Sequence, residues 1–339
     1  MIANVSRNGT RVGITGLGVH LPERVLTNQD LERMVETSDE WITERTGIKE
    51  RRIVAPDEAA SDIALPAARR ALAQARVTPE ELDGVVVGTT TPDMLFPTTA
   101  TLVAERLGAK QAAAHDLLAA CSGFVYGLAH AYGAVSGGLS ERTLVVGAEA
   151  LSKVVNWADR GTCILFGDGA GAAVVERVEE GGFLGFDLGA DASGGDDLFI
   201  AAGGSRRPAS AETVAGDMHT ITMRGPEVFR FATRIMVSSG SKLLEECGAT
   251  VDEVDLYVPH QANRRIIDHA AKSLGLPSEK VFLNIDRYGN TSAASIPICL
   301  AEAQAQGLLR RGTRVLMTGV GGGYTWGSSY LEWSDGGRR

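Results

Sequence analysis

The 339-residue chain lacks any long hydrophobic run. No segment approaches the roughly 20 consecutive apolar residues that a helix needs to cross a bilayer. The opening stretch, MIANVSRNGTRVGITGLGVHLPE, contains no apolar core of signal-peptide length. We therefore expect no membrane partner and a cytoplasmic location.

Cysteines are few, and basic residues are not clustered. The four cysteines form no Cys-x-x-Cys pair, so we expect reduced thiols and neither a disulfide framework nor a metal site. The formal net charge is −9, and no run of Lys or Arg is long enough to follow a phosphate backbone, which argues against nucleic acid as a partner. Aromatic residues make up only 6% of the chain, but 44% of it is hydrophobic and 22% is charged, a balance typical of a folded α/β enzyme.

The chain repeats part of itself at an offset of about 172 residues. ARVTPEELD at residues 75–83 aligns with CGATVDEVD at residues 247–255, and each follows a helix-like run and precedes a short apolar strand. At the same offset, RTLVVG at 142–147 aligns with RVLMTG at 314–319. The alternative is chance similarity between two α/β segments. A helix–turn–strand unit that recurs at one offset favours a duplicated fold.

Near-continuous β-branched runs such as GVVVG and TLVVG are separated by helix-length segments. This pattern is typical of buried strands in a mostly parallel sheet that is covered on both faces. We predict an α/β protein with two pseudo-duplicated halves, residues 1–181 and 182–339. Residues 191–213 are rich in Gly, Ser and Ala, and we expect them to form a surface excursion, either a lid or a plain loop, without a packed element.

Cys121 is the candidate nucleophile. It stands in LLAACSGFVYGLAHAYG, where an apolar approach meets small residues and then a helical pattern. A sulfur at a helix N-terminus feels the macrodipole, which favours the thiolate and pulls the thiol pKa below its free value of about 8.5. Taken alone, a cysteine among alanines is also a common small core residue. The surroundings of Cys121 in the fold therefore determine whether it is a nucleophile or a core residue.

Two further residues have a setting suited to chemistry. His260 directly follows a predicted strand in LYVPHQAN, so its ring should emerge at the carboxyl edge of a sheet, where α/β proteins bind ligands. Asn290 in RYGNTSAASIP opens a helix that duplicates the one bearing Cys121. The two helix starts should face each other across the pseudo-symmetric centre. The simpler alternatives are a structural histidine and an asparagine that caps a helix.

Two glycine-rich segments, FGDGAG at residues 166–171 and GVGGGYTWG near the C-terminus, let backbone N–H groups approach a ligand closely. The second segment can supply a donor to an oxyanion. Neither fits a P-loop or a correctly placed dinucleotide fingerprint.

Together these segments resemble the β-ketoacyl-acyl carrier protein synthase III family of the thiolase-like fold, whose members start bacterial type II fatty-acid synthesis. The resemblance covers nearly the whole chain. It is carried, in this order, by TSDEWITERTGIKERR, AACSGF, DRGTCILFGDGAGAAV, VPHQANRRI, GNTSAAS and GGGYTWGS. It implies a five-layer αβαβα arrangement of the two halves.

The resemblance also implies a decarboxylative condensation. Cys121 would take an acyl group from coenzyme A, and malonyl on acyl carrier protein would then lose carbon dioxide. The resulting enolate, held by His260 and Asn290, would attack the acyl-enzyme, while the backbone N–H groups of Cys121 and Gly322 would hold the oxyanion. Acyl-coenzyme A is a substrate here, and we expect no metal and no other cofactor.

Further positions match those with which the family binds its substrates and partners. Those for coenzyme A are Trp41, Arg45, Arg160 and Asn263, the last in the pantetheine tunnel. Those for the acyl pocket are Phe96 and Phe166, of which Phe96 reaches into the partner subunit of a homodimer in the family. Those for the acidic carrier protein are Gln261, Arg264, Arg265 and Lys272. The sequences TPDMLFP and NWADR around the acyl pocket depart from the family pattern, which leaves acetyl, branched-chain and longer primers open.

Other functions share parts of this pattern. The order Cys, His, Asn also occurs in papain-like hydrolases, but their motif around the cysteine and a secretory signal are missing here. A reversible thiolase would carry a second cysteine in the C-terminal glycine loop, and GVGGGYTWG has none. An inactive scaffold would be expected to lack Cys121. A paralogue that uses the same three residues for condensation or acyl transfer in secondary metabolism is the main alternative.

Overall fold

Two β-sheets form the frame of the protein, whose computed structural model describes residues 10–334. The first sheet has the strand order β1-β7-β6-β4-β5 and the second has the order β11-β12-β13-β8. The strands of the first sheet are β1 (Val12–His20), β4 (Gly84–Gly88), β5 (Ala113–Leu117), β6 (Arg142–Glu149) and β7 (Gly169–Arg177). The strands of the second sheet are β8 (Gly182–Ala190), β11 (Leu256–Pro259), β12 (Arg314–Gly321) and β13 (Thr325–Glu332).

The predicted duplication is confirmed by the pairing of these strands. β4 lies parallel to β6, which is antiparallel to β7, which in turn is antiparallel to β1. In the second sheet β11, β12, β13 and β8 follow one another with the same three directions. The expectation of mostly parallel sheets was wrong, because helices cover both faces of these sheets and burial of this kind gives antiparallel strands the same continuous apolar runs.

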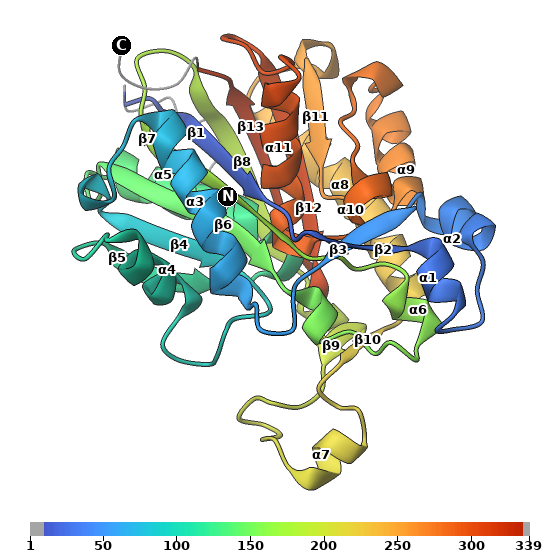
Figure 1. Ribbon diagram of the computed structural model, residues 1–339. Coiled ribbons are helices and arrows are strands. Elements are labelled where there is room, and N and C mark those ends of the chain that lie inside the picture. The colour runs from blue at the N-terminus through green and yellow to red at the C-terminus, as the bar shows by residue number, and fades with distance from the viewer. Residues whose placement is uncertain (1–9, 335–339) are drawn as a thin grey trace.

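Three layers of helices enclose the two sheets (Figure 1). The outer layer on the first sheet contains α3 (Ala60–Ala75) and α4 (Thr99–Leu107), and the outer layer on the second contains α8 (Gly225–Glu246) and α9 (Arg264–Leu274). The middle layer contains α5 (Gly123–Ser136) and α11 (Ser295–Ala305), which contact strands of both sheets. This is the expected five-layer αβαβα fold. Its central hydrophobic cluster joins the middle helices to both sheets.

The middle layer lies very close to the sheets where its two helices begin. A Cβ atom built on Gly147 of β6 would lie 2.2 Å from the carbonyl oxygen of Ala293. Only glycine permits this approach. It brings the turn before α11 from the second half directly onto a strand of the first half.

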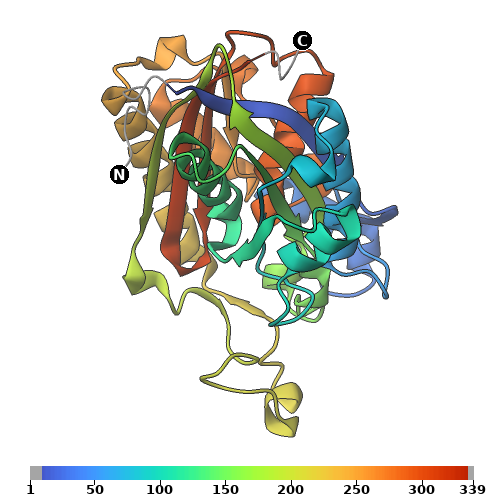
Figure 2. The ribbon, with the colours of Figure 1, turned by 90° about the vertical axis from the view of Figure 1, so that its left-hand side faces the viewer.

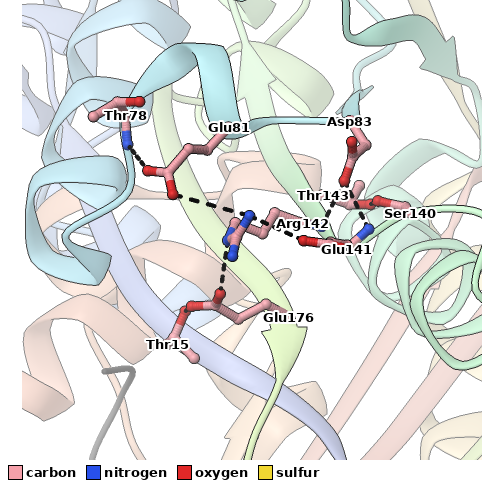
Figure 3. A network of polar contacts seen from close by, with 9 residues as sticks. All are labelled: Thr15, Thr78, Glu81, Asp83, Ser140, Glu141, Arg142, Thr143 and Glu176. Carbon is pink, nitrogen blue, oxygen red and sulfur yellow. Dashed lines mark hydrogen bonds and ion pairs between the residues drawn. The ribbon is translucent and has the colours of Figure 1, made fainter. Parts of the chain in front are cut away.

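The polar network around Arg142 in the first half (Figure 3) has a counterpart in the second half. Arg142 at the start of β6 pairs with Glu176 at 3.1 Å and with Glu81 at 4.0 Å, and the backbone N–H of Arg142 donates to Asp83. The counterparts 172 residues later repeat the pattern. Arg314 pairs with Glu253, and its backbone N–H donates to Asp255 at 2.8 Å. In each half, the aligned segments therefore form the same contact, in which an arginine at the start of a strand binds acidic residues of an adjacent turn.

Shorter elements complete the first half and approach the second. They are β2 (Arg24–Thr27), β3 (Glu50–Ile53), α1 (Asn28–Glu32), α2 (Asp39–Thr46) and α6 (Arg160–Cys163). In the second half, α10 (Ile285–Tyr288) precedes the turn to α11. α2 contacts α9, and α10 contacts β3, so that both halves contribute to the region between these elements.

The segment between β8 and α8 only partly behaves as expected. Strand β9 (Leu198–Ile200) pairs with β10 (Ile221–Met223), so residues 191–213 do contain a packed element, contrary to the prediction. Between these strands the chain forms an excursion that carries α7 (Ala211–Ala215) and projects from the body in both views (Figures 1 and 2).

Two further observations concern the limits of the fold. The predicted division at residue 181 falls in the turn between β7 and β8, and as a boundary between domains it stays a prediction. Within residues 10–334, no helix has the length and apolar character needed to span a membrane.

Candidate active site

A cavity of about 310 Å³ lies where the two halves meet. Cys121, His260 and Asn290 all line it. Cys121 belongs to the 3₁₀ turn Ala120–Ser122 before α5, His260 follows β11, and Asn290 follows α10. The structure thus brings together three residues that sequence reasoning selected from separate segments.

The thiol of Cys121 is largely buried, with 8% of the residue exposed. Its pKa is raised to about 12, mainly by burial and to a smaller extent by the nearby Glu149, while an interaction with the Ser292 side chain opposes the rise. The expectation of a thiol pKa below its free value was therefore wrong. The helix N-terminus is present, but loss of water around the sulfur outweighs the helix dipole.

The imidazole of His260 is held neutral. The residue is 1% exposed, and burial lowers its pKa to about 3. Its backbone N–H donates to the carbonyl of Thr318 at 2.8 Å, which fixes the residue to the middle of β12. Within residues 10–334, the ring nitrogen Nδ1 is buried without a hydrogen-bond partner. A neutral ring at this place can donate an N–H to a bound oxygen and does not carry a charge at pH 7.

The side chain of Asn290 is oriented as a donor. Its Oδ1 accepts the backbone N–H of Ser292 at 2.8 Å, so its Nδ2 is the group left for a ligand. The backbone on both sides is fixed, because Asn290 donates to the carbonyl of Leu165 at 2.8 Å and accepts from Gly167 at 3.0 Å. Asn290 is thus held more firmly than a simple helix cap would be.

The glycine loop between β12 and β13 closes over the nucleophile. A Cβ atom on Gly321 would lie 2.8 Å from the backbone nitrogen of Cys121, and Gly322 lines the same cavity. Beside them Tyr324 stacks on Phe231 with ring centroids 4.0 Å apart. The predicted oxyanion donors, Cys121 and Gly322, therefore lie at one wall.

The mouth of the cavity carries the predicted nucleotide-binding residues. The guanidinium of Arg45 lies 5.2 Å and that of Arg160 lies 4.9 Å from the ring centre of Trp41. Asn263 donates to the backbone carbonyl of Arg45 at 3.1 Å. Trp41, Arg45 and Asn263 line the cavity, and Arg160 adjoins it through the indole ring. An aromatic face between two cations suits a flat, anionic group such as a nucleotide.

Three of the residues predicted to bind the carrier protein lie exposed on α9. Arg265 packs over Phe229 at 5.7 Å and lines the mouth, Lys272 lies two turns further along the helix, and Arg264 pairs with Asp268 at 2.6 Å. The fourth prediction, Gln261, needs correction. Gln261 is 1% exposed, and its amide donates to the backbone carbonyl of Pro259 at 2.8 Å, so it supports the loop from within and offers no surface to a partner.

The two predicted acyl-pocket residues are separated. Phe166 is buried and lines the cavity. Phe96 is 83% exposed on a loop away from the cavity lining, so a single chain does not bring it to Cys121. Its exposed neighbours are also apolar.

Sequence reasoning missed two residues beside Cys121. Glu149 is fully buried at the end of β6, and Ser292 is buried in the turn before α11. The signal for Glu149 was an acidic residue ending an apolar strand, which is the setting that singled out His260. The signal for Ser292 was its position, because it is the duplicate of Ala120 at the offset of 172 residues.

Comparison with known proteins assigns the family. Residues 115–192 match 3-oxoacyl-[acyl-carrier-protein (ACP)] synthase III, and residues 244–333 match its C-terminal part. The chain is 57% identical to a β-ketoacyl-[acyl-carrier-protein] synthase III of Desulfitobacterium hafniense over 95% of this chain and 98% of that one. The counterpart from Symbiobacterium thermophilum is 58% identical over the same shares.

A solved structure agrees with these relatives. The β-ketoacyl-[acyl carrier protein] synthase III of Thermus thermophilus superimposes with a TM-score of 0.89 at 49% identity, covering 95% of this chain and 99% of that one. Fold, cavity and sequence thus point the same way, and the chain belongs to the β-ketoacyl-[acyl-carrier-protein] synthase III family.

Proposed function

We propose that the protein condenses an acyl-coenzyme A primer with malonyl-acyl carrier protein, giving a 3-oxoacyl-acyl carrier protein, carbon dioxide and free coenzyme A. This reaction would start type II fatty-acid synthesis. The observation that carries the proposal is the cavity that joins Cys121 to His260 and Asn290 and opens beside the cation-flanked ring of Trp41. A thioester bound at the sulfur would keep its nucleotide beside that ring.

The first half-reaction is an acyl transfer. The sulfur of Cys121 attacks the thioester carbonyl, and the backbone N–H groups of Cys121 and Gly322 stabilise the oxyanion. Collapse of the tetrahedral intermediate releases the coenzyme A thiolate, which takes a proton from water. The acyl group stays on Cys121.

The second half-reaction forms the carbon–carbon bond. Malonyl-acyl carrier protein docks against the basic residues of α9 and places its thioester oxygen between His260 and Asn290. The two neutral donors stabilise the enolate that forms as carbon dioxide leaves. The enolate carbon attacks the acyl carbonyl, and the thiolate of Cys121 is expelled. This proposal requires no cofactor besides the substrates.

A second copy of the chain would complete the acyl pocket. The apolar side chains of Met94, Leu95, Phe96 and Leu118 are exposed, and strand β5 forms the edge of its sheet beside Leu118. An apolar loop next to an unpaired strand edge suits a homodimer, in which Phe96 would enter the partner's cavity. The four free cysteines and the use of coenzyme A thioesters support a cytoplasmic location.

The test is acylation of the purified protein, followed by intact mass. Incubation with acetyl-, isobutyryl- and longer acyl-coenzyme A should add one acyl increment, and Cys121→Ala should abolish it. The extent of acylation by each acyl-coenzyme A ranks the primers. Addition of malonyl-acyl carrier protein should then remove the acyl group from Cys121 as a 3-oxoacyl product. Release of the free acid in its place would favour a hydrolase, and no increment from any donor would overturn the proposal.

A further inference from the structure

A buried carboxylate lies next to the cavity without a cation to neutralise it. Glu149 is fully buried, and no lysine or arginine within residues 10–334 lies at ion-pair distance from it. Its carboxylate accepts from the Thr90 hydroxyl at 2.9 Å, the Thr91 hydroxyl at 2.8 Å and the Thr90 backbone N–H at 3.1 Å. Burying an unpaired charge costs free energy, so a buried carboxylate without a cation indicates a function.

The carboxylate is connected to the nucleophile through one hydroxyl. Ser292 donates its hydroxyl to Oε1 of Glu149 at 2.8 Å. The turn that begins with Ser292 packs against the turn that carries Cys121, so that Ser292 lies between the thiol and the carboxylate and lowers the pKa of the thiol. This arrangement can pass a proton in one direction, from the thiol through Ser292 to Glu149. Because the Ser292 hydroxyl gives its one proton to Glu149, its oxygen is left to accept the proton of the thiol.

The proposed chemistry needs a destination for the thiol proton. Burial keeps Cys121 protonated, since its pKa is raised to about 12, and His260 is a poor acceptor, since its pKa is lowered to about 3. Burial also raises the pKa of Glu149 above its ordinary value, against the hydrogen bonds of Thr91, Ser292 and Thr90. A carboxylate with a raised pKa is a stronger base than an exposed one.

We infer that Glu149, acting through Ser292, stores the proton of Cys121 between the two half-reactions. The inference rests on the proposed role of Cys121 as the acyl acceptor. Glu149 touches no substrate, so it is a positioning and proton-holding residue for the thiol. The hydroxyls around it stabilise the ionised form that is ready to accept.

The steps balance over one turnover. As the sulfur attacks, the S–H bond breaks, its proton passes to the Ser292 oxygen, and the Ser292 proton passes to Oε1 of Glu149. Coenzyme A leaves as a thiolate and takes a proton from water. When the condensation expels the Cys121 thiolate, Glu149 returns its proton through Ser292. The enzyme regains its starting state, and the net reaction consumes one proton from solvent.

The surroundings of Glu149 limit what else could titrate there. The groups that face its carboxylate are the Thr89, Thr90 and Thr91 hydroxyls after β4 and the Ser292 hydroxyl before α11, with Cys121 as its titratable neighbour. The pH dependence of acylation should therefore report the carboxyl and the thiol.

The experiment measures single-turnover acylation by rapid quench and intact mass, from pH 5 to pH 9. In the wild type the rate should fall at the acid end as Glu149 becomes protonated. Glu149→Gln should acylate about 100-fold more slowly at pH 7, within the range for loss of a proton acceptor. The pH profile of this variant should lack the fall caused by protonation of Glu149. Its rate should rise about tenfold per pH unit as the thiol ionises without a proton acceptor. Glu149→Asp should keep the acid limb.

Two further variants separate this role from a structural one. Ser292→Ala leaves the carboxylate and its threonine donors in place and should show the slow rate and altered profile of Glu149→Gln, and the double variant should be no slower than the slower single one. Asp168→Asn removes another buried carboxylate, which holds Val54 and Ser152, and should keep the wild-type profile.

The outcomes distinguish the inference from the proposed function. If the wild type forms no adduct on Cys121, the proposed function fails. If the wild type acylates and Glu149→Gln or Ser292→Ala shares its pH profile, the proton-holding role is wrong and the condensing function stands. Should Glu149→Gln fail to fold, Ser292→Ala decides alone.

Discussion

Ala120 and Ser292 adopt the same left-handed backbone conformation, with φ values of 46° and 48°, and lie 172 residues apart in the chain. This conformation costs a residue other than glycine about 1–3 kcal/mol, yet both halves keep it. It makes a sharp turn before each middle helix. In the first half the turn presents Cys121, and in the second half it presents Ser292, whose hydroxyl donates to Glu149.

The glycine loop should tolerate no side chain at Gly321. A methyl group there would lie 2.7 Å from the carbonyl oxygen of Ala119 and 2.8 Å from the nitrogen of Cys121. Gly321→Ala should lower the acylation rate by about 100-fold through displacement of the oxyanion donor, and the free energy of unfolding by about 1–3 kcal/mol through overpacking. Rapid quench and urea denaturation measure the two effects. Gly195→Ala is the control, because its nearest atom would be 3.9 Å away.

His260 and Asn290 should act in the second half-reaction. His260→Ala and Asn290→Ala should still form the acyl adduct on Cys121. Carbon dioxide release from malonyl-acyl carrier protein should fall by about 100- to 1,000-fold in each, as for loss of one preorganised donor. Labelled malonyl substrate and intact mass measure the two steps separately. A variant that decarboxylates normally but does not acylate would reverse the assignment.

Trp41 should act on affinity for the nucleotide. Trp41→Ala removes the ring that lies between Arg45 and Arg160, and the KM for acyl-coenzyme A should rise about tenfold, equivalent to ~1.4 kcal/mol, while kcat stays unchanged. An acyl-pantetheine substrate lacks the nucleotide and should show no difference between the variant and the wild type. An equal loss with both substrates would mean that Trp41 supports the cavity itself.

The exposed basic residues of α9 should affect only the carrier-bound substrate. Lys272→Glu with Arg265→Glu should lower kcat/KM for malonyl-acyl carrier protein about tenfold at low salt, and the difference should shrink as salt screens the charges. With malonyl-coenzyme A in place of the carrier-bound substrate, Lys272→Glu alone should have little effect. Arg177→Glu, at the far end of β7, is the charge reversal that matches Lys272→Glu alone. A similar loss in that control would point to net charge and not to docking.

The buried ring of His260 should couple stability to pH. Its pKa is about 3 in the folded protein and about 6.5 when unfolded, so the unfolded state binds more protons between these values. The free energy of unfolding should therefore fall as pH drops from 6.5 towards 3, by up to about 1.4 kcal/mol per pH unit. His260→Gln should flatten this dependence in denaturant titrations. His269→Gln, on the exposed face of α9, should leave it in place.

The sequence predicted the site better than it predicted the properties of the site. Strand ends and the internal repeat located Cys121, His260 and Asn290, because a residue's place relative to a buried strand is a local property. The pKa of Cys121 was predicted in the wrong direction, because the desolvation that raises it comes from segments of both halves. Burial at the place where the two halves meet depends on packing between segments that are far apart in the sequence.

The same limit explains the other errors. Gln261 lies next to His260 in sequence, but its side chain turns inward to the carbonyl of Pro259, and no motif encodes that direction. The pairing of β9 with β10 joins two short segments across the α7 excursion, where composition indicates only a loop. The antiparallel strands could not be told from parallel ones, because helices bury both kinds equally.

The close contact of Gly147 with the turn at Ala293 has a consequence for how activity is lost. Residues of both halves line the cavity, and next to it a strand of the first half and a helix start of the second lie backbone against backbone. A partly unfolded molecule with one intact half would retain a sheet and its helices but no place for a substrate. Loss of catalysis on heating and loss of the fold should therefore be a single cooperative event.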